Sequence, residues 1–142
     1  MQSYFVLLLL WVVLSVTRAA DLSLQSHKEL LQDERVIAIK FYSAMCGSCK
    51  EFEPEWDAAV DKLKSVVTAK VNIDSAEGIK IAQATPGVLD GGIPSVVLYA
   101  SKSKPIIVVK GDVQKSKQVV AAIRKHVANL ARRDDGFFIK TN

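Results

Sequence analysis

The chain has 142 residues and a formal net charge of +4, and 49% of its residues are apolar. This length suits one domain together with a targeting segment. Basic residues are spread along the chain among acidic ones, which is typical of solvated faces and argues against a nucleic-acid-binding surface.

The first segment indicates the compartment. An apolar run from Phe5 to Val16 is shorter than the roughly 20 apolar residues that a membrane-spanning helix needs. Thr17 and Ala19 then supply small side chains, so we interpret residues 1–19 as a secretory signal peptide that is cut after Ala19. The run lacks a preceding Lys or Arg, and an uncleaved anchor is therefore the alternative. Cleavage would remove Arg18 as the segment's only charged side chain and leave +4 − 1 = +3.

No later run is long enough to span a membrane, so we expect no membrane attachment after the signal is removed. The signal peptide predicts an oxidising compartment, and the lumen of the endoplasmic reticulum is the expected location. The chain ends in Ile139-Lys140-Thr141-Asn142, which is not a retrieval tetrapeptide, and secretion is the alternative.

The elements up to residue 65 are predicted from apolar spacing. We expect a strand near Leu22–Leu24, a helix near Ser26–Gln32, and a buried central strand within Val36–Tyr42, which is almost wholly apolar. The segment 50–65 then carries apolar residues at helical spacing, which predicts an amphipathic helix that Pro54 should kink. The members of its stripe are Phe52, Trp56, Ala59, Val60 and Leu63.

Three strands and two helices are predicted in the second half of the chain. Val66–Ile73 is predicted as a strand and Ala76–Ala84 as a helix. Pro94–Ala100 and Pro105–Lys110 are two further strands, and the short connection between them implies an antiparallel hairpin. A last helix is expected over about Val113–Leu130. The predicted order is βαβαβαββα. The tail 132–142 stays open: it packs on the domain, binds a partner or is disordered.

Only two cysteines occur, Cys46 and Cys49, separated by Gly47 and Ser48. Closing a four-residue loop adds little stability, because short loops lose little chain entropy, but it suits a reversible redox couple. A zinc site would need about four ligands, and the two histidines are distant in sequence, so no metal is expected. An inert structural pair is the remaining alternative.

The predicted strand-to-helix junction places Cys46 at a helix N-terminus. Free backbone N–H groups and the positive end of the helix dipole stabilise an anion there, which lowers a cysteine pKa below its ordinary value of about 8.5. We therefore assign Cys46 as the exposed nucleophile and Cys49, one turn further inside, as the resolving thiol.

Several strings resemble the thioredoxin superfamily, and more closely a catalytic domain of a protein disulfide isomerase. They are FYSAMCGSCK at 41–50, PEW at 54–56, AKVN at 69–72 and GIPS at 92–95. The resemblance covers about residues 21–130 and implies an α/β thioredoxin fold, with a central mixed sheet and helices on both faces. The expected divisions are a signal peptide at 1–19, the domain at 20–131 and a tail at 132–142.

The resemblance also implies how substrates are handled. Ile93-Pro94 would be a cis peptide bond beside the cysteines, where an extended substrate segment could pair with the Ile93 backbone. Met45 stands where the family usually has tryptophan, and a flexible methionine suits adaptable contact. The expected partners are cysteine-containing proteins or peptides and an unidentified redox partner, with no bound cofactor.

Two departures from the family concern redox tuning. Gly47-Ser48 lacks the histidine that isomerases usually carry between the cysteines, and we expect a less oxidising couple. Lys40 stands where the family usually buries an acid that shuttles the proton of the second cysteine. Either Lys40 extends its ammonium to water and has no role, or it accepts that proton or stabilises the Cys49 thiolate.

The sequence therefore favours a thiol–disulfide oxidoreductase or isomerase that acts on disulfides of secretory-pathway proteins. Two alternatives remain. One is a non-catalytic peptide-binding or chaperone module that uses the apolar surface near Met45 and Pro94. The other is a dedicated thioredoxin-like reductase.

Overall fold

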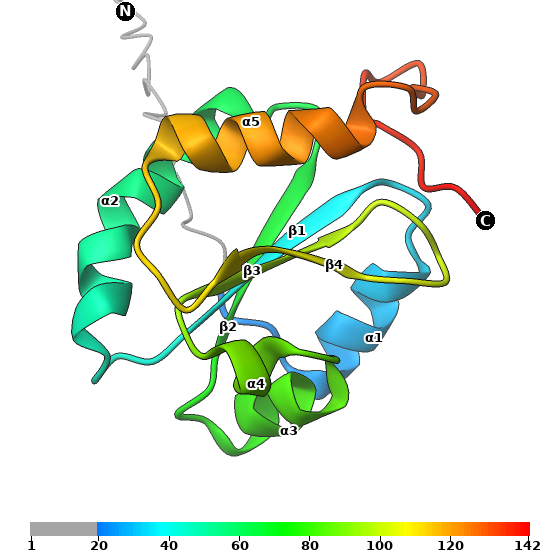
Figure 1. Cartoon of the computed structure of the whole chain (residues 1–142). Coiled ribbons are helices and arrows are strands. Elements are labelled where there is room, and N and C mark those ends of the chain that lie inside the picture. Colours follow the sequence, from blue (N-terminus) through cyan, green and yellow to red (C-terminus); the bar gives the residue numbers. More distant parts are fainter. Residues whose placement is uncertain (1–19) are drawn as a thin grey trace, which may run out of the picture.

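A computed structural model describes residues 20–142, and the predicted signal peptide at 1–19 lies outside the described residues. Its four-stranded mixed sheet has the order β2-β1-β3-β4 (Figure 1). β1 (Ile37–Tyr42) runs parallel to β2 (Val67–Asn72) and antiparallel to β3 (Ser95–Tyr99). β4 (Ile106–Lys110) pairs antiparallel with β3, which confirms the predicted hairpin.

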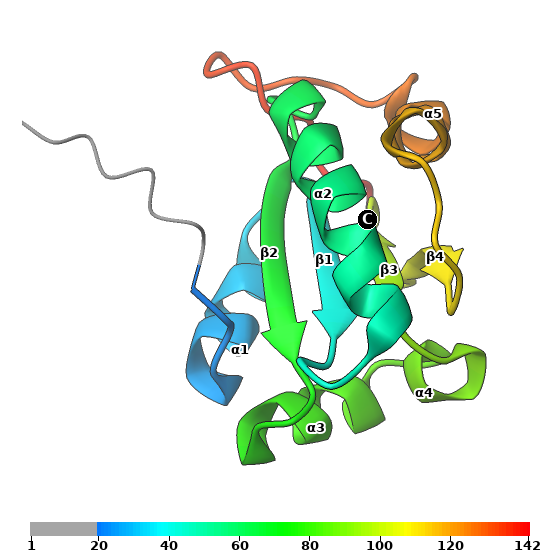
Figure 2. The same cartoon turned by 90° about the vertical axis from the view of Figure 1, so that its left-hand side faces the viewer.

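Helices cover both faces of the sheet. α2 (Gly47–Lys62) and α5 (Ser116–Val127) pack against one face. α1 (Leu24–Gln32), α3 (Ala76–Ala84) and the short α4 (Val88–Gly91) lie at the other. Figure 2 shows α1 and α2 on opposite sides of β1 and β2. Because β1 is covered on both faces, it can be nearly all apolar.

The central strand alternates between the two cores. Ala38 contributes to the cluster under α2 and α5, whereas Ile37, Ile39 and Phe41 contribute to the cluster beside α3. This period-two alternation directs Lys40 to the same face as Ala38, beneath α2. A lysine at this position is therefore enclosed by the fold, and its exposed fraction is only 1%.

The long helix that follows the cysteines is confirmed. α2 continues from Gly47 to Lys62 with Pro54 inside it, and the kink expected there stays a prediction. Four residues of the predicted stripe are buried, while Val60 is half-buried against the same cluster. Their burial seats the helix on the sheet and thereby sets where its N-terminus lies. The four are Phe52, Trp56, Ala59 and Leu63.

The predicted first strand at Leu22–Leu24 is wrong. Asp21 makes a single parallel bridge to Lys70, and helix α1 already begins at Leu24. The reason is a reciprocal cap: the Ser26 amide donates to Ser23 Oγ at 3.1 Å, and the Ser23 amide donates to Ser26 Oγ at 2.9 Å. This capping box favours a helix start over an extended strand.

The C-terminal tail packs on the domain. The Phe138 amide donates to the Ser65 carbonyl at 3.0 Å, and the Val36 amide donates to the Phe138 carbonyl at 2.8 Å. Lys140 Nζ donates to the carbonyl of Leu31 at 3.2 Å. The tail thus joins the chain just before β1 and β2, at the end of the sheet opposite the cysteines (Figure 1). Within residues 20–142, no helix has the length and apolar character needed to cross a membrane.

Candidate active site

The two cysteines lie where β1 passes into α2. Cys46 is the N-cap of α2, and it forms a disulfide with Cys49 across a Cα–Cα distance of 5.1 Å. Cys49 is buried at 3% exposure, whereas Cys46 is half-buried. The structure therefore has the predicted geometry, with one sulfur accessible at the helix start and the other one turn inside.

The surroundings of the Cys46 sulfur suit a thiolate. The Cys49 amide donates to Cys46 Sγ at 3.1 Å, and Ser48 Oγ lies 3.4 Å from it. In the reduced protein these donors, together with the N-terminal end of the α2 dipole, would stabilise negative charge on that sulfur. Gly47 is exposed, and a Cβ added there would meet nothing within 4 Å, so close packing does not require glycine at this position.

A loop opposite the cysteines brings the backbone of Ile93 to the site. The Ile93-Pro94 peptide bond is cis, as expected, and the Ile93 carbonyl oxygen lies 3.9 Å from Cys46 Sγ. The Ile93 amide has no hydrogen-bond partner among residues 20–142. Pro94 is buried, whereas Met45 is 84% exposed beside the nucleophile. An accessible sulfur, an unpaired backbone amide and an exposed apolar side chain thus share one surface.

Gly111 holds this loop in place. Its amide donates to the Pro94 carbonyl at 2.9 Å, and its φ of +75° lies in the left-handed region. A Cβ on Gly111 would come within 2.3 Å of the Gly91 carbonyl oxygen. Glycine is therefore required at this close approach, and it fixes the backbone that presents Ile93 to the cysteines.

Asp74 anchors the segment that leads into Cys46, and the sequence reasoning did not identify it. Ser43 Oγ donates to Asp74 Oδ1 at 2.6 Å, and the Ala44 amide donates to Oδ2 at 2.8 Å. The Met45 amide in turn donates to Ser43 Oγ at 3.1 Å. Asp74 follows β2 as Ser43 follows β1, and the ends of parallel strands share one sheet edge, which was the available signal.

The buried Lys40 forms an ion pair with the partly exposed Glu53 of α2. Of the two alternatives for Lys40, the one in which its ammonium reaches water is wrong, because α2 covers the end of the side chain and offers it a carboxylate. Its Nζ also lies 4.9 Å from the centroid of the Tyr42 ring. Glu53 follows Cys49 by four residues and so shares its side of the helix. The pair therefore lies one helical turn beyond the resolving cysteine.

Tyr42, also on β1, lies beside this ion pair. Its hydroxyl lies 3.0 Å from both carboxylate oxygens of Asp21 and donates to that group. Burial, reinforced by the hydrogen bond to Asp21, raises the pKa of Tyr42 to about 12. The phenol thus stays neutral across the ordinary pH range, and its ring faces the Lys40 ammonium.

The two histidines belong to other helices than the cysteines. His27 belongs to α1, where burial lowers its pKa, and its Nε2 has no hydrogen-bond partner among residues 20–142. His126 belongs to the last turn of α5. Among residues 20–142, no group of three or more His, Cys, Asp or Glu side chains is arranged to hold a metal ion.

The sequence is similar to those of known proteins. The family model named Thioredoxin matches residues 18–125. Human protein disulfide-isomerase A6 is 28% identical over 81 residues, which cover 56% of this chain and 18% of that protein. The chain thus spans less than a fifth of that relative's length. Thioredoxin of Mycoplasma pneumoniae is 31% identical over 77 residues, which cover 54% of this chain and 71% of that protein.

Solved structures show the same architecture. The first thioredoxin domain of mouse protein disulfide-isomerase A4 has a TM-score of 0.62 at 20% identity, covering 82% of this chain and 81% of that one. Malassezia sympodialis thioredoxin has a TM-score of 0.56 at 29% identity, covering 73% of this chain and 88% of that one. These likenesses confirm the expected α/β fold with a mixed sheet between two helical layers.

Proposed function

The chain belongs to the thioredoxin family, and from this premise we propose that it is a thiol–disulfide oxidoreductase of the protein disulfide isomerase type, acting on cysteine-containing proteins of the secretory pathway. The family and the paired cysteines support thiol–disulfide exchange as the reaction class. One observation carries the proposal: a disulfide at a helix start, with one accessible and one buried sulfur.

In the reducing direction, the Cys46 thiolate attacks one sulfur of a substrate disulfide. A mixed disulfide forms, and the other substrate sulfur leaves as a thiolate that takes up a proton. Cys49 then loses its proton and attacks the Cys46 sulfur, which releases the second substrate thiol. The substrate gains two electrons and two protons, and the enzyme keeps the Cys46–Cys49 disulfide; substrate oxidation is the reverse of these steps. In isomerisation, a substrate thiol resolves the mixed disulfide in place of Cys49.

The neighbouring residues position the substrate in this proposal. An extended peptide would accept a hydrogen bond from the unpaired Ile93 amide, as an added strand does, beside the buried ring of Pro94. Met45 would supply flexible apolar contact at the rim, because its side chain is exposed and unbranched. Ser48 lies within reach of the Cys46 sulfur and is a neutral donor, so we expect a couple less oxidising than one with a cation there.

The secretory pathway is proposed from the N-terminal sequence. Residues 1–19 have the apolar core and small-residue end of a signal peptide, and relatives of the chain carry the name protein disulfide-isomerase A6. The lumen of the endoplasmic reticulum is the proposed location, with secretion as the alternative. After each net reduction or oxidation of a substrate, a separate redox partner must restore the oxidation state of the cysteines, whereas isomerisation leaves it unchanged.

Two assays test the proposal: reduction of insulin by dithiothreitol, and refolding of scrambled ribonuclease. We expect the protein to accelerate at least one of them and the Cys46→Ser variant to be inactive. Cys49→Ser should accumulate a mixed disulfide with substrate, because the resolving thiol is missing. Substrate binding without turnover in both assays would favour the peptide-binding alternative, which the 84% exposed Met45 also suits. A measured reduction potential would separate a reductase from an isomerase.

A further inference from the structure

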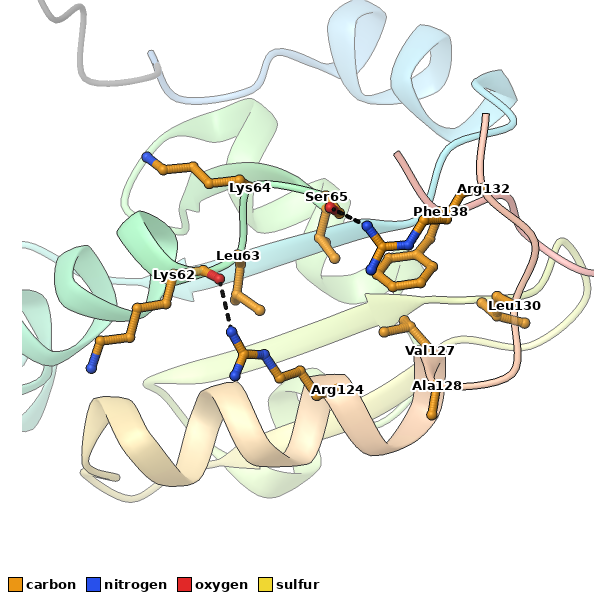
Figure 3. Close-up of a pocket in the computed structure, with 11 residues that line it drawn as sticks. Lys62, Leu63, Lys64, Ser65, Arg124, Val127, Ala128, Leu130, Arg132 and Phe138 are labelled. Carbon is orange, nitrogen blue, oxygen red and sulfur yellow. Dashed lines mark hydrogen bonds between the residues drawn. The ribbon is translucent and has the colours of Figure 1, made fainter. Parts of the chain in front are cut away.

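A pocket of about 410 Å³ lies far from the cysteines, where the C-terminal ends of α2 and α5 meet the tail (Figure 3). Its volume falls in the range of roughly 300–1,000 Å³ that is typical of small-molecule sites. The cysteines lie at the other end of α2, and 16 helical residues separate the two places by about 24 Å. The apolar lining is made by Leu63, Val66, Val127, Leu130 and Phe138.

Two arginines from different elements flank this apolar lining. Arg124 comes from α5 and donates to the Lys62 carbonyl at 3.4 Å. Arg132 comes from the tail, donates to Ser65 Oγ at 3.0 Å, and places its guanidinium 4.1 Å from the centroid of Phe138. A guanidinium has five N–H donors, so these contacts leave most of the donors on Arg124 unused.

The charge at the pocket is of one sign. Lys62 and Lys64 also line it, although Figure 3 shows their side chains extending outward. No acidic residue lines the pocket in the part of the chain that the structure describes. Neither Arg124 nor Arg132 forms an ion pair with a carboxylate of residues 20–142. The planar guanidinium group of arginine matches the geometry of a carboxylate. Two guanidinium groups that have no carboxylate partner among residues 20–142 and lie beside an apolar surface therefore favour the binding of an anion.

A simpler role for these cations is to complement helix C-termini, whose carbonyls carry partial negative charge. Arg124 does this for α2 through the Lys62 carbonyl. That role explains one long hydrogen bond, but it requires neither a second guanidinium from the tail nor an apolar cavity between the two. The remaining donors and the cavity together describe a site for a molecule with an anionic head and an apolar body.

We propose that this pocket binds a small amphiphilic carboxylate. The head group lies between Arg124 and Arg132, and the hydrocarbon body lies against Leu63, Val127 and Phe138. Binding at this place requires no exchange of the disulfide, and the cysteines keep their own substrate surface. The site is therefore a second function of the domain, independent of the proposed redox reaction.

The probe is sodium decanoate, titrated into the purified protein while backbone amide chemical shifts are recorded by NMR. We expect saturable shifts at Leu63, Val127 and Phe138. Decyltrimethylammonium has the same tail with the opposite charge, and acetate has the charge without the tail. Each should bind on the order of tenfold more weakly or worse, because each lacks one half of the recognition.

The matched variants are Arg124→Gln and Lys125→Gln. Both remove one positive charge from α5, but Lys125 does not line the pocket. We expect Arg124→Gln to weaken decanoate binding by about tenfold and Lys125→Gln by less than about twofold, because only the first loses a charge-assisted hydrogen bond. Circular dichroism confirms the fold of each variant, and insulin reduction should be the same in both.

Three outcomes would overturn the site: no saturable shifts at the pocket, equal binding of decanoate and decyltrimethylammonium, or equal weakening by the two variants. Arg132→Gln gives a second measurement from the other side of the pocket, and unchanged decanoate affinity in that folded variant would also count against the site. Cys46→Ser should bind decanoate as the unmodified protein does. Loss of redox activity and loss of carboxylate binding are thus separately measurable.

Discussion

The ion pair between the buried Lys40 and the partly exposed Glu53 leads to a prediction that depends on which partner is removed. Lys40 is 1% exposed, whereas the Glu53 side chain is 36% exposed. Glu53→Gln leaves an ammonium enclosed without its carboxylate, whereas Lys40→Met leaves a carboxylate that can turn to water. The two single substitutions should therefore differ in cost although they break the same pair.

The magnitude follows from the burial of each partner. Removing one member of a fully buried pair costs about 3–5 kcal/mol. Glu53 is more than a third exposed, so solvent screens the pair, and we expect Glu53→Gln to lower the free energy of unfolding by about 2 kcal/mol. Lys40→Met keeps the volume filled by an apolar chain and should cost less than about 1 kcal/mol.

Urea denaturation of the oxidised protein measures this difference, with the double variant Lys40→Met/Glu53→Gln completing the cycle. The double variant should be more stable than Glu53→Gln alone, because it contains no unpaired ammonium. A Lys40→Met variant that loses as much stability as Glu53→Gln, or more, would refute the reasoning.

The same substitution tests whether Lys40 takes part in thiol–disulfide exchange. The pair lies one turn beyond Cys49, so we expect Lys40→Met to slow the attack of Cys49 on the mixed disulfide while leaving the first attack by Cys46 unchanged. Quenched-flow trapping of the mixed disulfide separates the two steps. An unchanged resolution rate in a folded Lys40→Met variant would assign the pair to stability alone.

Three further predictions concern other contacts. Asp74→Ala removes the hydrogen-bond acceptor of Ser43 and should lower the free energy of unfolding by about 1–2 kcal/mol. It should also slow insulin reduction, because the loop before Cys46 loses its anchor. Insulin reduction at the wild-type rate would contradict this. Lys140→Met should lower the unfolding free energy by about 1–2 kcal/mol in urea, because the partly buried carbonyls of Leu31 and Asp33 lose their donor. The folded Tyr42 pKa of about 12 exceeds its ordinary value of 10.0, so the stability it contributes is present below pH 10 and is lost as pH rises through 12. In alkaline unfolding curves Tyr42→Phe should lose that dependence, and an unchanged pH profile would show that another group causes it.

Local sequence patterns predicted most of the fold. The apolar alternation of β1, the helical stripe of α2 and the bounds Ala76–Ala84 of α3 were readable from neighbouring residues alone. The reading of Leu22–Leu24 as a strand failed because apolar character was given more weight than the cap formed by Ser23 and Ser26. Both signals are local, and here the hydrogen-bonding one prevailed.

The partners of polar side chains were not readable in the same way. Lys40 was identified as unusual, but its partner lies 13 residues away on a helix whose rotation over the sheet is set by packing. The tail was left open, and its donor Lys140 bonds a carbonyl 109 residues earlier. The separation along the chain is what hid these contacts, since periodicity reports only on neighbours within a few turns.

By itself, therefore, the amino-acid order determined most of the segments that become strands and helices and put a cysteine pair at a helix start. Only the tertiary structure decided that α2 buries Lys40 against Glu53, that Asp74 secures the approach to Cys46, and that the tail completes a cationic pocket with Arg124. The first set follows from backbone geometry and local side-chain periodicity. The second requires elements distant in sequence to pack, because a charged group finds its partner only when both elements are in place.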